Sequence, residues 1–260
     1  MTPRSLLVDK EHGRNRDGTQ DLAAIIGPKI FDNPKPLKLV KHLVDIGADD
    51  SRSIIMDFFA GSGTTAHAVM LKNAADNGQR RCISVQLREA TSRLDYPTIV
   101  DITKERIRRA GRTIKAEAAM TAPDLDTGFR VLKIDTSNMK DVYYAPDDLK
   151  QLDLLGHLDN IREDRTPEDL LFQVLVDWGI DLALPIATES VCGKDVFFVD
   201  GNALAACFDS DISEDLVKAL AQRNLLRAVF RDDSYGSDSV KINVEQIFKL
   251  LSPSTEVRSI

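Results

Sequence analysis

The stretch that decides the fold is residues 54–67, IIMDFFAGSGTTAH. It begins with an apolar, β-branched run, which predicts a short buried strand. The run breaks at Gly61-Ser62-Gly63, and a helix-like stretch follows Thr64 and Thr65. Glycine lets the backbone approach a ligand without a Cβ in the way, and a helix N-terminus presents free N–H groups and a partial positive charge. Strand, glycine turn and helix in this order therefore predict a cradle for a carboxylate or phosphate.

An acid stands at the end of the predicted strand. Asp57 is placed to bind an amine next to an anion held by the turn. Few ligands carry both charges on one small fragment, and the methionine end of S-adenosyl-L-methionine (AdoMet) is one of them. The alternative is an ordinary strand-to-helix turn in a parallel sheet. Gly61-x-Gly63-x-x-Ala66 also fits the loose dinucleotide pattern, which on its own is a weak signal.

A second element favours a nucleotide-type cofactor. Residues 81–87 predict the next strand, and Gln86 stands near its end, where an adenosine ribose is bound in such folds. Most such sites place Asp or Glu there, whereas Gln bonds a ribose hydroxyl without carrying a charge. The uncharged Gln86 and the lack of a recognisable hydride-transfer site disfavour one hypothesis for such a site, an NAD-dependent oxidoreductase.

Three motifs resemble those of one family. Residues 57–65 (DFFAGSGTT) resemble the AdoMet-binding motif of DNA amino-methyltransferases, and residues 31–36 (FDNPKP) resemble the Lys-Pro motif that precedes it in the permuted β-class. Residues 83–87 (ISVQL) resemble the motif that follows. Residues 126–131 (DTGFRV) and 240–247 (VKINVEQI) are similar to the end of the methylation (Mod) subunit of type III restriction-modification systems, a DNA adenine-N6 methyltransferase. The resemblance runs from about Arg4 to Ile260 and covers only the C-terminal part of that subunit.

The resemblance implies an α/β fold. It implies an incomplete Rossmann-like, AdoMet-dependent methyltransferase sheet, largely parallel and in three layers, followed by a smaller α+β C-terminal domain. With the composition, it predicts an arm or linker over residues 1–30, the AdoMet-binding part over 31–120 and an assembly domain over 121–260. It assigns no catalytic residue and no metal ligand to this chain.

The resemblance also implies a cofactor site. The cofactor-binding residues come from the three motifs and are Lys35, Pro36, Asp57, Phe59, Ala60, Gly61, Ser62, Gly63, Thr64, Thr65 and Gln86. Asp57 would bind the AdoMet amino group, and Lys35 would lie nearer the carboxylate in the cradle formed by residues 61–65. Phe59 would pack on the cofactor or the incoming base, and Gln86 would hold the ribose.

One motif of the family is missing. These enzymes bind the flipped base with an Asp-Pro-Pro-Tyr type motif N-terminal to the Lys-Pro motif, and no two prolines are adjacent in this sequence. The upstream target-recognition region is missing too. The leading hypothesis is the AdoMet-binding portion of a site-specific adenine-N6 methyltransferase that is inactive alone. The alternative is an inactive truncated or split product that acts as an assembly module.

Composition limits the partners. The formal net charge is -7, so DNA binding cannot rely on bulk charge. The expected partners are DNA through the complete enzyme, the missing N-terminal half or a homodimer partner, and a restriction subunit. Cys82, Cys192 and Cys207 have no CxxC spacing and predict packed thiols. The sequence has no signal pattern and no apolar run of membrane-spanning length, which predicts a cytoplasmic protein without a membrane partner.

The densest basic stretch lies within residues 98–119, a predicted helix. Ile102, Ile107, Ala110 and Ile114 mark its apolar face. The other face is predicted to carry the basic residues Lys104, Arg106, Arg108, Arg109, Arg112 and Lys115. A solvated face is the common explanation of such charge, and contact with DNA phosphates is the alternative.

The C-terminal part offers no catalytic constellation. Residues 147–161 predict an amphipathic helix, in which His157 is structural. Thr166-Pro167-Glu168-Asp169 predicts a helix start, with the helix ending near Trp178-Gly179. Residues 191–208 predict two or three antiparallel strands. Asp232-Asp233 predicts an acidic turn, with a cation site as the alternative.

Overall fold

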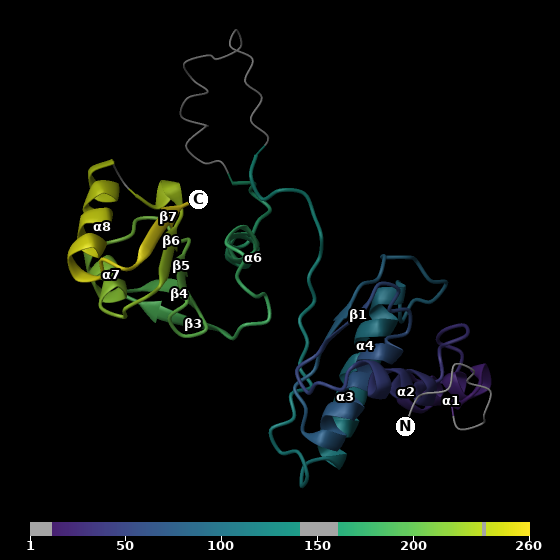
Figure 1. Cartoon of the computed structure of the whole chain (residues 1–260). Coiled ribbons are helices and arrows are strands. Elements are labelled where there is room, and N and C mark those ends of the chain that lie inside the picture. Colours follow the sequence, from purple (N-terminus) through teal and green to yellow (C-terminus); the bar gives the residue numbers. More distant parts are fainter. Residues whose placement is uncertain (1–11, 141–160, 236–237) are drawn as a thin grey trace. The chain divides into compact units, whose positions relative to one another are not determined.

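Figure 1 shows a computed structural model of the chain, which describes residues 12–140, 161–235 and 238–260. The chain forms two compact units, the N-terminal unit (Met1–Arg130) and the C-terminal unit (Val131–Ile260). Residues 147–160 of the predicted helix, with His157, lie outside the described residues, as does the start of the predicted arm; Ile161 is described and forms a β-bridge with Met139. None of the helices in the described ranges has the length and hydropathy needed to cross a bilayer.

The N-terminal unit contains two parallel strands joined through a helix. These are β1 (Ile54–Asp57), α3 (Thr64–Asp76) and β2 (Arg81–Ser84). Ile54 pairs with Arg81, and Asp57 pairs with Ser84. The parallel pairing that the strand-turn-helix-strand order predicts is therefore confirmed.

Helix α3 is the centre of this unit. Its buried residues point in all directions around the helix and are Thr64, Ala66, His67, Ala68, Val69, Met70 and Asn73. Helix α2 (Leu37–Gly47) packs on one side, where Val44 meets Ala68 and Val69. Helix α4 (Ile99–Glu117) packs on another side through Ile107, Ala110 and Ile114. A helix buried all round holds its N-terminus in a fixed place, which matters for the site.

Residues that the sequence places in an arm or linker also form a helix. Helix α1 (Asn15–Ile26) packs on α4, because Leu22 and Ile26 bury their side chains against Ile102. Asp21 Oδ2 accepts a hydrogen bond of 2.9 Å from the backbone N–H of Leu37, the first residue of α2. Helix α1 thus supports the segment that carries the Lys-Pro motif.

Only one face of the two-stranded sheet is covered. Ile55 and Cys82 pack into the cluster between α2 and α3, whereas Ile54, Met56 and Ile83 are 54%, 48% and 46% exposed. Side chains alternate between the two faces of a strand, so helices on one side leave every second residue in solvent. The prediction of a buried strand inside three layers is wrong for the described residues, in which helices cover a single face.

The C-terminal unit is a five-stranded mixed sheet in the order β3-β4-β5-β6-β7. The first three strands, β3 (Ile186–Val191), β4 (Lys194–Val199) and β5 (Leu204–Cys207), form an antiparallel meander. Strands β4 and β5 confirm the prediction for residues 191–208, whereas β3 ends where that range begins. However, β5, β6 (Arg227–Phe230) and β7 (Glu256–Ser259) are parallel. The antiparallel strands that the sequence predicts therefore account for one half of the sheet, and the other half is parallel.

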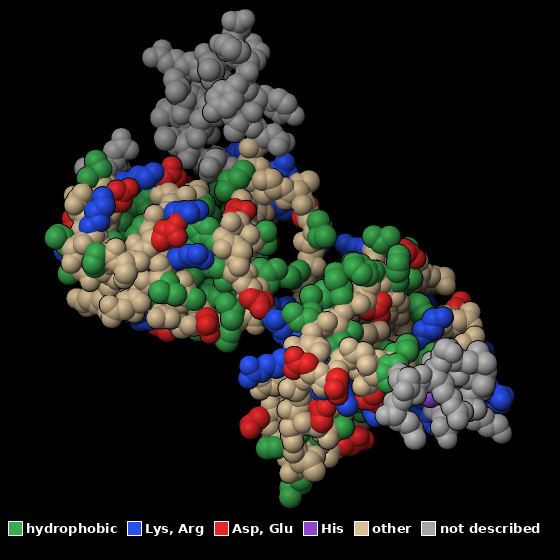
Figure 2. All heavy atoms as spheres, in the orientation of Figure 1, with side chains coloured by type: hydrophobic (Ala, Val, Ile, Leu, Met, Phe, Trp, Pro, Cys, Tyr) green, Lys and Arg blue, Asp and Glu red, His purple; other side chains and the backbone are tan. Residues whose placement is uncertain are grey.

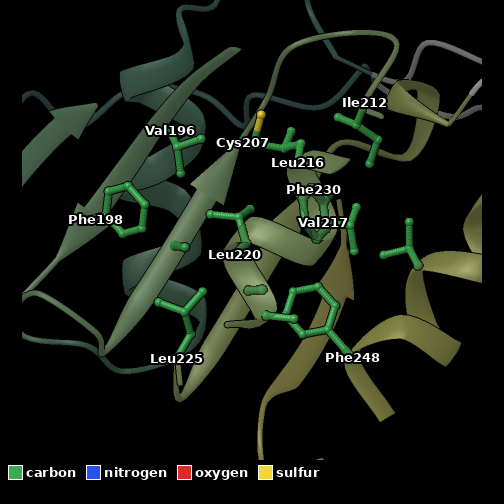
Figure 3. Packing of buried hydrophobic residues seen from close by; sticks show 14 of the residues in the cluster. Val196, Phe198, Cys207, Ile212, Leu216, Val217, Leu220, Leu225, Phe230 and Phe248 are labelled. Atoms are coloured by element: carbon green, nitrogen blue, oxygen red, sulfur yellow. The ribbon is translucent and has the colours of Figure 1, made fainter. Parts of the chain in front are cut away.

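Helices cover both faces of this sheet. The two crossovers, α7 (Glu214–Ala221) and α8 (Asp238–Leu251), pack on one face, and the core between them is drawn in Figure 3, where Leu216 and Leu220 of α7 lie beside Phe230 and Phe248. Helix α6 (Pro167–Asp177) contributes Leu171 and Leu175 to the core on the other face. Thr166 and Asp169 cap α6 reciprocally, and Trp178 ends it, as predicted.

Two smaller predictions, one on the cysteines of both units and one on an acidic turn of the C-terminal unit, have different outcomes. Cys82 is half-buried and Cys207 buried, but Cys192 is exposed, because it lies with Gly193 in the turn between β3 and β4. The prediction of packed thiols is wrong for Cys192. Asp232 and Asp233 lie in a short 3-10 helix and form ion pairs of 2.5 Å with Lys241 and 2.6 Å with Arg231, which favours the acidic turn over a cation site.

Candidate functional site

The glycine turn between β1 and α3 has the backbone geometry that the sequence predicts. Gly61 and Gly63 have positive φ angles of 50° and 78°, and Gly63 is the N-cap of α3. A Cβ on Gly63 would lie 3.2 Å from Thr103 Cγ2, so this position needs glycine for its conformation and for its packing. In the described structure, no backbone acceptor pairs with the first three N–H groups of α3, at residues 64–66.

Asp57 is held in place at the end of β1. Its Oδ1 accepts a hydrogen bond of 3.1 Å from the Phe59 N–H, and its Oδ2 accepts one of 2.6 Å from Thr65 Oγ1. A carboxylate has about four acceptor positions, so two remain for a ligand amine. Phe59 itself is 85% exposed and Ala60 is buried.

Gln86 reaches the same turn from the end of β2. Its Oε1 accepts a hydrogen bond of 2.8 Å from the Gly61 N–H, and its Nε2 donates to the carbonyl of Leu87 at 3.3 Å. The structure therefore brings together Asp57, Thr65, Gly61 and Gln86. In this arrangement the amide oxygen of Gln86 stabilises the turn.

The Lys-Pro motif lies at the start of α2. Pro36 is the N-cap of α2, and the backbone of residues 34–36 packs closely on Gly18 of α1. Lys35 is exposed, and no described hydrogen bond or ion pair joins it to Asp57 or to the glycine turn. Phe31 is the residue of this motif that meets the turn, because its ring lies 3.4 Å from a Cβ built on Gly61.

Helix α4 holds the glycine turn from behind. Thr103 Oγ1 donates to the carbonyl of Gly61 at 2.5 Å. Arg106 Nη1 donates to Ser62 Oγ at 2.9 Å and to Thr64 Oγ1 at 2.7 Å. Ser62 and Thr64, which are predicted to line the cradle, are almost fully buried and turn their hydroxyl groups toward this arginine.

Arg106 does not lie on the face of α4 that the sequence predicts. It is predicted to lie on a solvated basic face, but it is 0% exposed. The signal was present, because Arg106 follows Ile102 by four residues and precedes Ala110 by four, which places it on the apolar face of the helix. The other basic residues behave as expected: Lys104 pairs with Asp101 at 2.8 Å, and Arg108 and Arg109 pair with Glu105 at 2.5 and 2.6 Å.

Two buried bases lie near the turn. Burial lowers the pKa of Arg106 to about 10 and that of His67 to about 4, and the charge of Arg106 lowers the His67 pKa further. His67 Nδ1 and Arg106 Nε and Nη2 are buried without a hydrogen-bond partner among the described residues. The core behind the turn therefore contains one positive charge, Arg106, next to a neutral imidazole.

This arrangement can bind a ligand that carries both an anion and an amine. Unpaired N–H groups at the start of α3 suit the anion, and the free acceptor positions of Asp57 suit the amine. In the described segments, no group of three or more His, Cys, Asp or Glu side chains could hold a metal ion.

Comparison with known proteins identifies relatives of the chain. Residues 6–95 match the model of a family described as DNA methylase. The Mod subunit of the type III enzyme StyLTI from Salmonella typhimurium is 37% identical over 153 residues, which cover 56% of this chain and 22% of the relative. The EcoPI Mod subunit of Escherichia phage P1 is 30% identical over 235 residues, 85% of this chain and 34% of the relative.

A third relative agrees with these two. The EcoP15I Mod subunit of Escherichia coli is 32% identical over 203 residues, 74% of this chain and 28% of the relative. The chain thus spans about a fifth to a third of the length of these curated relatives. The predicted resemblance is confirmed: residues 6–95 match the DNA methylase family, and the chain is similar to the Mod subunits of type III restriction-modification systems over part of their length.

Proposed function

We propose that the chain is the AdoMet-binding portion of a site-specific DNA adenine-N6 methyltransferase of the type III Mod kind. The observation that carries this proposal is the pairing of Asp57 with the glycine turn. A fixed carboxylate and the unpaired N–H groups of α3 stand on the two sides of one turn. The family match over residues 6–95 supports the same reading of this turn.

AdoMet fits the residues present. Its amine would bind Asp57, its carboxylate would bind the N-terminus of α3, and the exposed Phe59 ring is free to pack on the cofactor or on a flipped base. Gln86 would exchange its bond to Gly61 for one to a ribose hydroxyl. AdoMet supplies an activated methyl group, and the task of the protein is to align it with the adenine amine, which needs no covalent protein nucleophile. Lys35 and Pro36 would act at the edge of the site, since they lie at the start of α2.

The uncovered side of the sheet is the proposed contact with the rest of the enzyme. We define the open sheet surface as the exposed apolar residues on and just after β1 and β2, namely Ile54, Met56, Phe58, Phe59, Ile83, Val85 and Leu87. Figure 2 shows hydrophobic side chains gathered on the visible face of the N-terminal unit, over the region where Figure 1 labels β1. An apolar patch of this kind favours a partner, and the proposed partner is the half of the methyltransferase domain that carries the Asp-Pro-Pro-Tyr motif.

DNA and a restriction subunit are proposed partners of the complete enzyme. Type III Mod subunits are the relatives of this chain, and the chain spans a third or less of their length. DNA contact through the basic side chains of α4 remains a secondary proposal, because Lys104, Arg108 and Arg109 already pair with acidic residues of the same helix.

The test is calorimetric titration of the chain with AdoMet. We expect weak but measurable binding, since the open sheet surface leaves one side of the domain exposed to water. Asp57→Ala removes a charge-assisted bond worth about 1.5–3 kcal/mol, so the affinity should fall by about tenfold or more. Asp124→Ala, at an exposed acid of the same unit, is the matched control and should bind as the wild type does. Equal affinities for the wild type and Asp57→Ala would refute the assignment.

The second candidate function is an assembly module with a vestigial site. The hydrogen bond from the Gly61 N–H to Gln86 Oε1 favours it, because both groups are then occupied and the turn offers fewer groups to a ligand. The same titration separates the two candidates. A wild-type chain that folds but takes up no AdoMet at millimolar concentration would support the module.

A further inference from the structure

Arg106 is a cation inside the core. It is 0% exposed, and no carboxylate in the described part of the chain forms an ion pair with it; the charge of Asp21 acts to raise its pKa, but the effect of burial is larger and lowers it. Within the part of the chain that the structure describes, Nη1 bonds to the hydroxyl groups of Ser62 and Thr64, whereas Nε and Nη2 have no partner. Removing an unpaired charge from water is strongly unfavourable, so a packing role alone would be better served by a methionine or leucine.

The partners of Arg106 belong to the turn that begins α3. A guanidinium group can only donate hydrogen bonds, so both hydroxyl oxygens must act as acceptors toward it. The two oxygens lie 3.3 Å apart, and at most one hydroxyl can donate to the other. Arg106 therefore sets the direction of both hydroxyl groups and places its charge directly behind the N-cap of α3.

The positive charge and the helix terminus act in the same sense. The unpaired N–H groups at residues 64–66 carry the positive end of the α3 dipole, and Arg106 adds a full charge in a region with little water to screen it. The pair is stabilised when a negative group occupies the turn. The buried, partly unpaired arginine is thus an independent observation that points to an anionic ligand at this helix terminus.

We propose that Arg106 is a positioning residue that makes the turn select the carboxylate of its ligand. This inference rests on the proposed function, in which the ligand is AdoMet. Arg106 acts through Ser62, Thr64 and the α3 terminus without touching the ligand. Asp57 is responsible for the amine, so the two ends of the methionine fragment are recognised by different residues.

The experiment compares AdoMet with decarboxylated AdoMet, which keeps the amine and the sulfonium but lacks the carboxylate. Both are titrated into the wild type, Arg106→Gln and Arg106→Lys. Glutamine can still donate to the hydroxyl groups but removes the charge, and lysine restores the charge. Arg112→Gln, at an exposed arginine of the same helix, is the matched control.

We expect Arg106→Gln to lower the affinity for AdoMet by about tenfold, the order expected for a charge at a partly buried helix terminus. Its affinity for decarboxylated AdoMet should stay within about twofold, and Arg106→Lys should recover most of the AdoMet affinity. Asp57→Ala, in contrast, should weaken both ligands. Circular dichroism and thermal melting show whether each variant is folded.

Two results would overturn the inference. One is an equal loss of both ligands in Arg106→Gln, which would mean that the arginine only supports the fold. The other is unchanged AdoMet binding in a folded Arg106→Gln. If Arg106→Gln does not fold, Arg106→Lys decides: with the charge kept, its affinities for AdoMet and for decarboxylated AdoMet should both stay close to those of the wild type, and an equal loss of both ligands would overturn the inference. A wild type that binds neither ligand would refute the proposed function itself.

Discussion

Thr65 Oγ1 donates a hydrogen bond of 2.6 Å to Asp57 Oδ2 and so ties the first turn of α3 to the end of β1. The bond crosses the glycine turn, with Asp57 on one side and the unpaired N–H groups of α3 on the other. It turns the carboxylate toward the helix terminus and leaves its remaining acceptor positions for a ligand.

Thr65→Val is expected to weaken AdoMet binding without changing the fold. Valine keeps the shape of threonine but cannot donate, so Asp57 loses one of the bonds that orient it. The loss of a hydrogen bond to a charged group predicts a decrease in affinity of about tenfold. Thr65→Ser keeps the hydroxyl and is the control. Calorimetry that gives the same affinity for the valine and serine variants would show that this bond does not orient Asp57.

Gly63→Ala is expected to destabilise the N-terminal unit. Alanine at a φ of 78° costs about 1–2 kcal/mol, and its Cβ would also press on Thr103 Cγ2, for which overpacking adds about 1–3 kcal/mol. Gly193 has a φ of 79° and nothing within 4 Å of a built Cβ, so Gly193→Ala bears the conformational cost alone. Urea unfolding followed by circular dichroism measures both. Equal decreases in the free energy of unfolding would mean that α4 shifts and accommodates the added methyl group.

His67 predicts a pH dependence of stability. Its pKa is about 4 in the folded chain and 6.5 in the unfolded chain, because burial disfavours the imidazolium. The unfolded chain therefore binds more protons between these values, and stability falls as the pH drops from about 6.5 to about 4. Above about pH 6.5 the imidazole is neutral in both the folded and the unfolded chain, and His67 no longer lowers the stability.

The measurement for His67 is urea unfolding at pH 7.5 and pH 5.0. The wild type should lose on the order of 1–2 kcal/mol more than His67→Gln between the two pH values, since one pKa unit is worth about 1.4 kcal/mol. The comparison with the variant removes the contribution of other titrating groups. The same loss in both proteins would mean that His67 is solvated in the folded state.

Methyl transfer by these 260 residues should require the half of the enzyme that carries the missing motif, supplied here as a second polypeptide. Holding a flipped adenine costs a few kcal/mol, and this chain lacks the Asp-Pro-Pro-Tyr type motif that serves this purpose in the family it resembles. The purified chain should transfer no labelled methyl group from AdoMet to DNA. Activity should appear when a polypeptide that carries the upstream half is added.

A variant of the open sheet surface tests the same prediction and has a matched control. Met56→Lys should reduce the rescue by the second polypeptide, because it puts a charge into the proposed contact. Met120→Lys changes a methionine that is 94% exposed just beyond α4 and should have no effect. Turnover by the chain alone, lost on Asp57→Ala, would show that the missing motif is not needed.

Much of the site was readable from local sequence. Gly61 and Gly63 act through backbone geometry and Asp57 through hydrogen bonds to residues 59 and 65, all within a few residues, and the strand, turn and helix around them are set by local patterns. The parallel pairing of β1 and β2 also followed, since a strand-helix-strand unit has one common handedness. In the C-terminal unit, the capping residues Thr166 and Asp169 predicted where α6 begins for the same local reason.

Other features depended on distant partners. The exposure of Ile54 and Met56 depends on which face the helices cover, and an apolar strand has the same pattern whether one or both faces are buried. The parallel β5-β6-β7 half of the C-terminal sheet depends on which strand edges pair, and the sequence of a short strand does not show whether it pairs parallel or antiparallel with its neighbour.

By itself, the sequence determined a glycine turn between a strand and a helix, with an acid before it and a glutamine near the end of the next strand. These features depend on φ angles, helix ends and short-range hydrogen bonds, which neighbouring residues control. The tertiary structure alone decided that Thr103 and Arg106, some 40 residues further along the chain, hold that turn from behind. A buried charge is favourable only where packing brings it to its partners, and that placement comes from the contact between α3 and α4.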